Sequence, residues 1–291
     1  MTSSAIVRAM RPKQWIKNVF VLAALVFSGH LGDSALVAKA LLAFAAFCAL
    51  SSAVYLFNDV RDRDLDRLHP AKRLRPIAAG ELSTRAAAGA AAVLSIGGLA
   101  LAWALRPAFA GTALLYLALH AAYSLGLRRV VILDVMLVAA GFLIRAWAGA
   151  VVIGVETSHW LALCTGLLAL FLGFVKRRQE IVALGGVAAQ RPILREYSVP
   201  FLDQMIAVVT ASTVLAYSLY AFSGEVAERV GTRHLGLTIP FVLFGIFRYL
   251  YLVHQKGEGE NPSFLVFADR ALLANLLLWA AAVVFAVYVW R

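Results

Sequence analysis

The sequence predicts an all-α polytopic membrane protein, with nine transmembrane helices in one domain that covers residues 1–291. The first observation is the composition, because 62% of the residues are hydrophobic and only 15% are charged. Soluble proteins have about 45–50% apolar and about 25% charged residues. The second observation is that the apolar residues form runs of about 20, the length that an α-helix needs to cross a bilayer. With 21 glycines, 8 prolines and 2 cysteines, the collagen-like, disordered and disulfide-rich classes are excluded.

Nine segments are long and apolar enough to span a membrane. We place them at residues 15–31, 35–57, 86–105, 108–127, 130–153, 158–176, 203–224, 235–254 and 270–290. The first is the weakest, because Lys17 and Asn18 interrupt its start. Alanine and glycine are frequent in the segments, which lets helices pack closely and leaves a homo-oligomer possible. Cys48 and Cys164 lie in apolar runs, so we interpret both as packing residues.

Positive charge falls mainly on one side of the predicted spans. The net charge is +11, and 20 of the 27 Lys and Arg residues lie in the N-terminus and the even-numbered loops. The positive-inside rule then predicts a multi-pass protein of the inner (plasma) membrane with a cytoplasmic N-terminus and an outside C-terminus. The long loops 58–85 and 177–202 fall on the cytoplasmic side, where we expect the function. No nucleic-acid partner is expected.

Acidic residues follow the second predicted span at helical spacing. Asn58, Asp62 and Asp66 stand at i, i+4 and i+8, and Asp59 lies beside this row. Oxygen ligands that converge at a helix end suit Mg²⁺, which usually completes its shell with water and substrate phosphate. We assign Asn58 and Asp62 as metal ligands. The alternative is a solvated helix end in which Asp and Arg form i, i+4 pairs.

A basic loop follows the acidic row. Lys72, Arg73 and Arg75 lie between Pro70 and Pro76, which stiffen the loop. Beside a bound Mg²⁺, these three cations would bind a diphosphate or a sugar phosphate. The alternative is a topology signal that contacts only lipid headgroups.

The pattern Asn58-Asp59-x-x-Asp62-x-x-x-Asp66, followed by Arg75-Pro76, resembles the first signature of the UbiA superfamily of intramembrane prenyltransferases. The resemblance covers nearly the whole chain, in span count as well as in motifs. It implies a bundle of nine transmembrane helices with a cytoplasm-facing active site. It also implies that Mg²⁺ and a diphosphate bind at two motifs on the cytoplasmic side.

The second motif departs from the common pattern of that superfamily. Prenyltransferases carry a second Asp-rich motif after the sixth helix, whereas this chain has Lys176, Arg177 and Arg178 followed by Glu180. Two Asp-rich motifs suit two Mg²⁺ ions on a prenyl diphosphate. A cluster of cations suits direct contact with phosphate, although three cations after a span are also an ordinary topology signal.

The N-terminal run Arg11–Asn18 and the Lys176-Arg177-x-x-Glu180 element together resemble one branch of the superfamily, the decaprenyl-phosphate phosphoribosyltransferases. The resemblance implies transfer of 5-phosphoribose from phosphoribosyl diphosphate to a polyprenyl phosphate in the bilayer, with release of diphosphate, for the arabinan precursors of the cell wall. Lys13 and Lys17 in this run, and Tyr55 at the end of the second span, are candidate substrate-binding residues.

The reaction needs few protein groups. Mg²⁺ at Asn58 and Asp62 stabilises the charge that develops on the leaving diphosphate. The anomeric carbon becomes oxocarbenium-like, so Asp59, Asp66 or Glu180 would stabilise it as the catalytic carboxylate. The acceptor phosphate is already anionic, so no general base is required.

Three further residues are candidate substrate contacts. Tyr123 and Arg128 close the fourth span and resemble a Tyr–Lys element of the superfamily, or form an interfacial aromatic and a topology pair. Arg145 lies deep in the fifth span, where ions are costly and usually functional. It binds substrate or else orders the wall of the pocket. His120 is interpreted as a packed histidine.

Two other functions compete with this interpretation. One is a UbiA-type prenyltransferase that moves a polyprenyl group from its diphosphate to an aromatic acceptor. The other is a transporter or channel, which would place polar groups near the middle of the bilayer rather than at one surface. The chain length and double-bond geometry of the acceptor are left open by the sequence.

Overall fold

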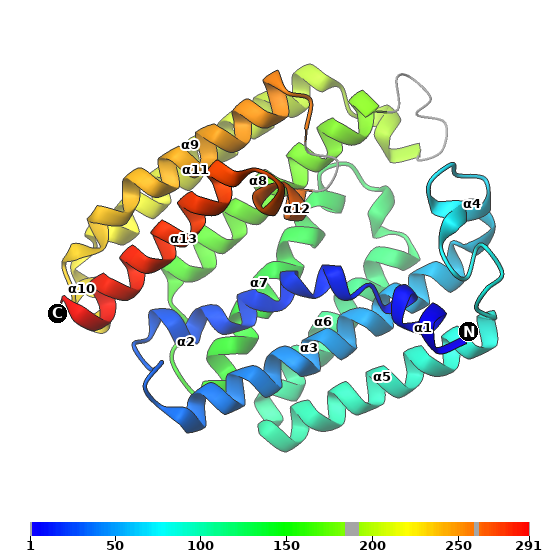
Figure 1. The fold of residues 1–291 in the computed structure, drawn as a ribbon, viewed down its shortest axis with the longest axis horizontal. Coiled ribbons are helices and arrows are strands. Elements are labelled where there is room, and N and C mark those ends of the chain that lie inside the picture. The colour runs from blue at the N-terminus through cyan, green and yellow to red at the C-terminus, as the bar shows by residue number, and fades with distance from the viewer. Residues whose placement is uncertain (1, 184–191, 259–261, 291) are drawn as a thin grey trace. The chain divides into compact units, whose positions relative to one another are not determined.

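The computed structural model describes residues 2–183, 192–258 and 262–290, and within these ranges every regular element is a helix. The elements in chain order are α1 (Thr2–Met10), η1 (Pro12–Leu22), α2 (Ala23–Phe27), α3 (Ser34–Arg61), α4 (Arg63–Arg67), η2 (Lys72–Leu74), α5 (Thr84–Leu105), α6 (Pro107–Leu125), η3 (Leu127–Arg129), α7 (Leu133–Ile153), α8 (His159–Ala183), η5 (Pro192–Glu196), α9 (Val199–Phe222), α10 (Gly224–Val230), η6 (His234–Thr238), α11 (Ile239–Gln255), α12 (Pro262–Ala268), α13 (Arg270–Val284) and η7 (Phe285–Val289) (Figure 1).

The chain forms two compact units. Unit 1 contains Met1–Ala24, Asp33–Leu127 and Ile144–Glu156, and unit 2 contains Leu25–Gly32, Arg128–Leu143 and Thr157–Arg291. Helix α7 begins in unit 2 and ends in unit 1 without a break. One continuous helix is therefore shared by both units.

Eight helical segments among the described residues are long and apolar enough to cross a membrane. They begin and end within about four residues of eight of the predicted spans, except that α8 continues to Ala183, past the predicted end at 176. Helices α3, α5, α6, α7, α8 and α9 are six of them. The other two join η6 to α11 and α13 to η7. The prediction of a polytopic helical membrane protein is confirmed, whereas the count of nine spans is not.

The segment 15–31 differs from the prediction in its geometry. Instead of one long α-helix it forms η1, a 3-10 helix of 11 residues, followed by the 5-residue α2. Its polar residue Asn18 is fully buried and donates to the hydroxyl of Ser51 at 3.1 Å. A 3-10 helix rises about 2.0 Å per residue rather than 1.5 Å, so η1 covers more distance per residue than an α-helix would.

Small residues let the helices of unit 1 approach closely. Helix α3 packs against α5 and η1, and its buried face includes Ala40, Ala43 and Ala46 (Figure 1). Gly149 of α7 lies directly against the backbone of η1, because a Cβ built there would stand 2.0 Å from the carbonyl oxygen of Val21. Association of helices in a bilayer depends on such backbone contacts.

Polar caps fix where the long helices begin. The side chain of Asp33 accepts hydrogen bonds from two backbone N–H groups at the start of α3. Ser83, Ser198 and Asp269 each accept one such bond at the starts of α5, α9 and α13. Each cap satisfies a backbone N–H group that the helix leaves without an internal partner. In unit 2, α8 packs along α9, and α11 packs against α13 (Figure 1).

We predict that Gly149→Ala destabilises the protein, because neither the backbone of Val21 nor that of α7 can move aside as a flexible side chain would. The expected loss is at least about 1–3 kcal/mol, the usual cost of overpacking. It is measured as a lower midpoint of thermal unfolding in detergent. Gly111→Ala in α6 is the control, because a Cβ there meets nothing within 4 Å. Equal midpoints for the two variants would contradict the close contact.

Candidate functional site

The acidic row lies where α3 passes into α4 in unit 1. The N–H of Asp62 donates to the carbonyl of Asn58 at 2.8 Å, and the N–H of Asp66 donates to the carbonyl of Asp62 at 2.8 Å. The helical i, i+4 pattern therefore continues through the short break at Asp62, which ends α3 and precedes α4. Asn58, Asp62 and Asp66 keep the one-turn spacing that the sequence predicts.

Two carboxylates, Asp66 in this row and Asp59 beside it, are buried and share one arginine. Asp59 is 2% exposed and Asp66 is 4% exposed. Arg75 Nη1 lies 3.1 Å from Asp59 Oδ1 and 2.6 Å from Asp66 Oδ2. Arg11 also pairs with Asp59 Oδ1. Because buried carboxylates are costly unless they are paired, these two arginines are what allows Asp59 and Asp66 to lie inside unit 1.

Arg11 reaches this cluster from an unusual backbone conformation. Its φ is 56° and its ψ is 61°, in the left-handed region, and it immediately precedes Pro12. Its guanidinium lies 5.0 Å from the centre of the Tyr55 ring, a cation–π arrangement. Sequence reasoning placed Arg11 in a motif without giving it a role. The following proline predicts an extended residue before it, so the left-handed conformation of Arg11 has no signal in the sequence.

The donor set at the end of α3 fits a magnesium ion that is only partly held by protein. Asn58 Oδ1 accepts a hydrogen bond from the hydroxyl of Ser124, Asp62 is half-buried, and Asp59 Oδ2 is buried with no hydrogen-bond partner. Among the described residues no group of three or more His, Cys, Asp or Glu side chains could hold a metal. Mg²⁺ is commonly bound through one or two protein oxygens, with waters and substrate phosphates completing its shell.

Two structural contacts position the loop and the helix beside this row. His69 Nδ1 accepts hydrogen bonds from the N–H groups of Ala71 and Lys72 at 3.2 and 3.4 Å, which shapes the turn into the basic loop. Arg61 donates to the carbonyl oxygen of Ser124 at the C-terminus of α6, where the helix dipole favours a cation. Sequence reasoning missed the roles of Arg61 and Ser124.

Arg145 lies inside unit 1 rather than at its surface. It is 4% exposed, and it donates to Asn18 Oδ1 at 2.8 Å and to the hydroxyl of Tyr116 at 2.8 Å. The ring of His120 packs edge-on against Tyr116, with 4.4 Å between ring centres. Arg145 therefore joins η1, α6 and α7, which supports an ordering role, and His120 is packed as predicted.

A second cluster of charges lies in unit 2, on α8. Arg177 has a side chain that is 7% exposed, and it donates from Nε to Asp134 Oδ2 at 2.7 Å and from Nη1 to Glu180 Oε2 at 2.6 Å. The next residue, Arg178, pairs instead with Asp203 of α9 at 2.6 Å. The neighbouring cations of the sequence motif therefore bind different carboxylates on different helices.

Tyr197 and a strained turn complete this cluster. The hydroxyl of Tyr197 donates to Asp134 Oδ1 at 2.6 Å and accepts from the N–H of Ile132 at 2.6 Å. Ile132 has a φ of 68°, and the N–H of Leu133 donates across it to the carbonyl of Val131 at 2.7 Å. A β-branched residue rarely adopts a positive φ, and such strain costs of order 1–3 kcal/mol.

The other predicted substrate-binding residues lie at or near the surface. Exposed side chains belong to Lys13, Arg73 and Lys176, and half-buried ones to Lys17, Lys72, Tyr123 and Arg128. Tyr123 belongs to unit 1 and Arg128 to unit 2, although the sequence places them in one short element.

The residues 18–291 match the UbiA prenyltransferase family. The chain belongs to this family. A UbiA homologue from Archaeoglobus fulgidus, bound to GPP and Mg²⁺, has a TM-score of 0.73 and 19% identity, and the match covers 98% of this chain and 100% of that one. This similarity shows the UbiA-like fold and confirms the predicted fold class.

Two curated relatives carry the same name, decaprenyl-phosphate phosphoribosyltransferase. The one from Mycolicibacterium smegmatis is 35% identical over 98% of this chain and 93% of its own length. The one from Mycobacterium tuberculosis is 37% identical over 96% of this chain and 93% of its own length. The predicted branch of the UbiA family is therefore confirmed.

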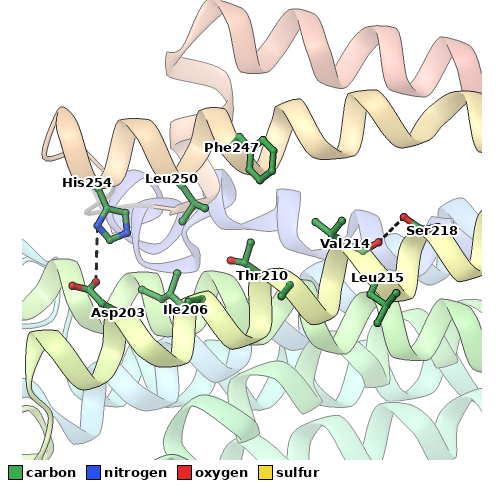
Figure 2. Close-up of a pocket in the computed structure, with 11 residues that line it drawn as sticks. Asp203, Ile206, Thr210, Val214, Leu215, Ser218, Phe247, Leu250 and His254 are labelled. Carbon is green, nitrogen blue, oxygen red and sulfur yellow. Dashed lines mark hydrogen bonds and ion pairs between the residues drawn. The ribbon is translucent and has the colours of Figure 1, made fainter.

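An apolar groove of this UbiA chain contains none of the predicted site residues. It has a volume of about 670 Å³ and lies along α9 and α11, within unit 2 (Figure 2). Ile206, Val214 and Phe247 are among its lining residues, and Asp203 and His254 lie together at one end. The charged clusters, not this groove, hold the groups that phosphate chemistry needs.

We predict that Arg75→Gln lowers the free energy of unfolding by about 2–3 kcal/mol, because it leaves the buried carboxylate of Asp66 without its cation. Thermal or denaturant unfolding in detergent measures the change. The matched control is Arg73→Gln, two residues earlier in the same loop. Because the side chain of Arg73 is exposed, we expect little change in the free energy of unfolding. A wild-type midpoint for Arg75→Gln would contradict the bridging role.

Proposed function

We propose that this enzyme transfers 5-phosphoribose from phosphoribosyl diphosphate to a polyprenyl phosphate and releases diphosphate. The observation that carries the proposal is the near full-length similarity to the two relatives named above. The charges agree with it: unit 1 offers an acidic row, whereas unit 2 offers the cation-rich Lys176–Glu180 element where a second acidic motif would suit a prenyl diphosphate. The relatives' names make decaprenyl phosphate the acceptor to test first.

The donor's diphosphate is proposed to bind at the acidic row. Asn58 and Asp62 would hold Mg²⁺, which neutralises charge on the diphosphate as it leaves. Lys72 and Arg73 add cations from the adjoining loop, while Arg75 keeps the carboxylates of Asp59 and Asp66 in place. Lys13 and Lys17, with Tyr55 beneath Arg11, are proposed to contact the same substrate.

The chemical step is a single displacement at the anomeric carbon. An oxygen of the acceptor phosphate forms a bond to this carbon as the bond to diphosphate breaks, and diphosphate leaves with the electron pair. Positive charge develops on the ribose ring, so a fixed carboxylate nearby lowers the barrier. Asp59, Asp66 and Glu180 are the candidates, because arginine hydrogen bonds hold each of them in one orientation.

The second cluster is proposed to bind an anionic phosphate. Lys176 is exposed, and Arg177 is held by Asp134 and Glu180. Lys176 would therefore contact the phosphate directly, and the positive charge of Arg177 would attract the phosphate from beside it. Tyr123 and Arg128 remain proposed substrate contacts, whereas Arg145, predicted either to bind substrate or to order the wall of the pocket, is proposed to order the wall. The distribution of cations supports an enzyme of the inner membrane whose N-terminus is cytoplasmic and whose C-terminus is outside.

The experiment that tests the function uses purified protein with Mg²⁺, phosphoribosyl diphosphate and a polyprenyl phosphate. We expect polyprenyl-phosphoryl-phosphoribose in the lipid extract and free diphosphate in the aqueous phase, identified by mass spectrometry. The anomeric carbon should be inverted. The assignment fails if phosphoribosyl diphosphate is inert while a prenyl diphosphate and an aromatic acid react.

We predict that Asn58→Ala and Asp62→Ala abolish Mg²⁺-dependent turnover, because each removes an oxygen ligand from the metal site. The control is Asp64→Ala on the same short helix, since the side chain of Asp64 is 89% exposed and pairs only loosely with Arg67 at 3.6 Å. Turnover of Asp64→Ala should stay within about twofold of wild type. Equal losses for Asp62→Ala and Asp64→Ala would exclude a metal site on one helical face.

A further inference from the structure

Tyr197 and Asp134 join three elements of unit 2 through one chain of hydrogen bonds. The chain runs from the N–H of Ile132 to the hydroxyl of Tyr197, then to Asp134, and from Asp134 to Arg177. Arg177 carries it on to Glu180. The turn before α7, the residue after η5 and helix α8 are thereby connected. None of the contacts is longer than 2.7 Å.

Each group in this chain of hydrogen bonds has the donors and acceptors that its neighbours require. The hydroxyl of Tyr197 accepts from Ile132 and donates to Asp134 through a single oxygen atom, which a phenyl ring in its place could not do. Burial and the hydrogen bond to Asp134 raise the pKa of Tyr197, so its hydroxyl stays protonated and keeps donating. Asp134 is fully buried, and it uses one oxygen for Tyr197 and the other for Arg177.

The orientation of Arg177 follows from these contacts. A guanidinium is planar, so fixing Nε on Asp134 fixes the plane in which the two terminal nitrogens lie. One of these nitrogens binds Glu180. The carboxylate proposed to act in catalysis and the cation beside the proposed anion site are therefore held by a residue 43 positions earlier in the chain.

The turn at Ile132 shows that this arrangement is maintained against strain. Its φ of 68° is unfavourable for a β-branched side chain. Strained conformations persist only where the surrounding structure determines them, and they concentrate at functional sites. Here the hydroxyl of Tyr197 holds the N–H of the strained residue itself.

We propose that Tyr197 and Asp134 are positioning residues for phosphoribosyl transfer, which fix Arg177, and through it Glu180, beside the phosphate site proposed at Lys176. This inference rests on the proposed function. It assigns to Tyr197 a role that acts wholly through Arg177. It therefore predicts that the two residues are not independent.

The test is a double-mutant cycle on the full-length protein in detergent. Tyr197→Phe, Arg177→Gln and the double variant are compared with wild type for the KM of phosphoribosyl diphosphate, for kcat and for the midpoint of thermal unfolding. We expect each single variant to raise the KM about tenfold or more. The double variant should have the KM of Arg177→Gln alone, because Tyr197 then has nothing left to position.

The matched control is Tyr249→Phe. Tyr249 is also buried in unit 2, and its hydroxyl has no hydrogen-bond partner, so the KM should stay within about twofold of wild type. If Tyr197→Phe does not fold, Asp134→Asn replaces it in the cycle, because the amide keeps the shape of the carboxylate, removes its charge and replaces one of its two acceptor oxygens by a donor. Non-additivity with Arg177→Gln is again the expected result.

The outcomes separate three cases. Non-additive effects on the KM support the positioning role. Effects on the KM that multiply, or a lower unfolding midpoint with an unchanged KM, overturn it and leave Tyr197 with a structural role alone. A wild-type protein that releases no diphosphate from phosphoribosyl diphosphate removes the proposed function before any variant is made, and the positioning role is lost with it.

Discussion

Both candidate sites depend on pairs of carboxylates that share an arginine, and three of these four carboxylates, Asp59, Asp66 and Asp134, are buried. In unit 1, Arg75 bridges Asp59 and Asp66, and in unit 2, Arg177 bridges Asp134 and Glu180. A carboxylate removed from water without a partner would take up a proton or unfold the structure around it. Each arginine therefore allows two acidic groups to be fixed at the end of a membrane helix. The helices on either side can then pack at close range, as α3 does against α5.

This arrangement also suits the chemistry of polyanionic substrates. Groups held by hydrogen bonds need no reorganisation when charge develops during a reaction, which is the main source of electrostatic catalysis. The acidic row alone would repel a diphosphate, and the cationic loop alone would bind it without orienting a metal. Because Arg75 belongs to the loop and contacts the acidic residues, the two are held as one structure. One oxygen of Asp59 in this cluster, Oδ2, is buried without a hydrogen-bond partner.

The sequence predicts what depends on local spacing and misses what depends on distant contacts. Eight spans follow from the apolar runs, and the row Asn58–Asp62–Asp66 follows from the helical repeat. The pairing of Arg11 with Asp59 crosses 48 positions and that of Tyr197 with Asp134 crosses 63, so no periodicity shows them. Arg177 and Arg178 are adjacent in the motif, yet they lie 100° apart around a helix by the usual 3.6-residue repeat. Which carboxylate each of them binds depends on partners 43 and 25 positions away, so the repeat does not show it. The hydrogen bond from Arg145 to Asn18 of η1 likewise crosses 127 positions.

The order of the residues along the chain determines when the ion pairs of each cluster can form during synthesis. Arg11 is made before Asp59, and Arg75 follows Asp66 by nine positions. Both cations of the first cluster are therefore present soon after its carboxylates have been made. Asp134 precedes Arg177 by 43 positions and Tyr197 by 63. At about 5–20 residues per second, several seconds pass between the synthesis of Asp134 and that of its partners. The ion pair of Asp134 therefore forms later than that of Asp66, because α8 must be made first.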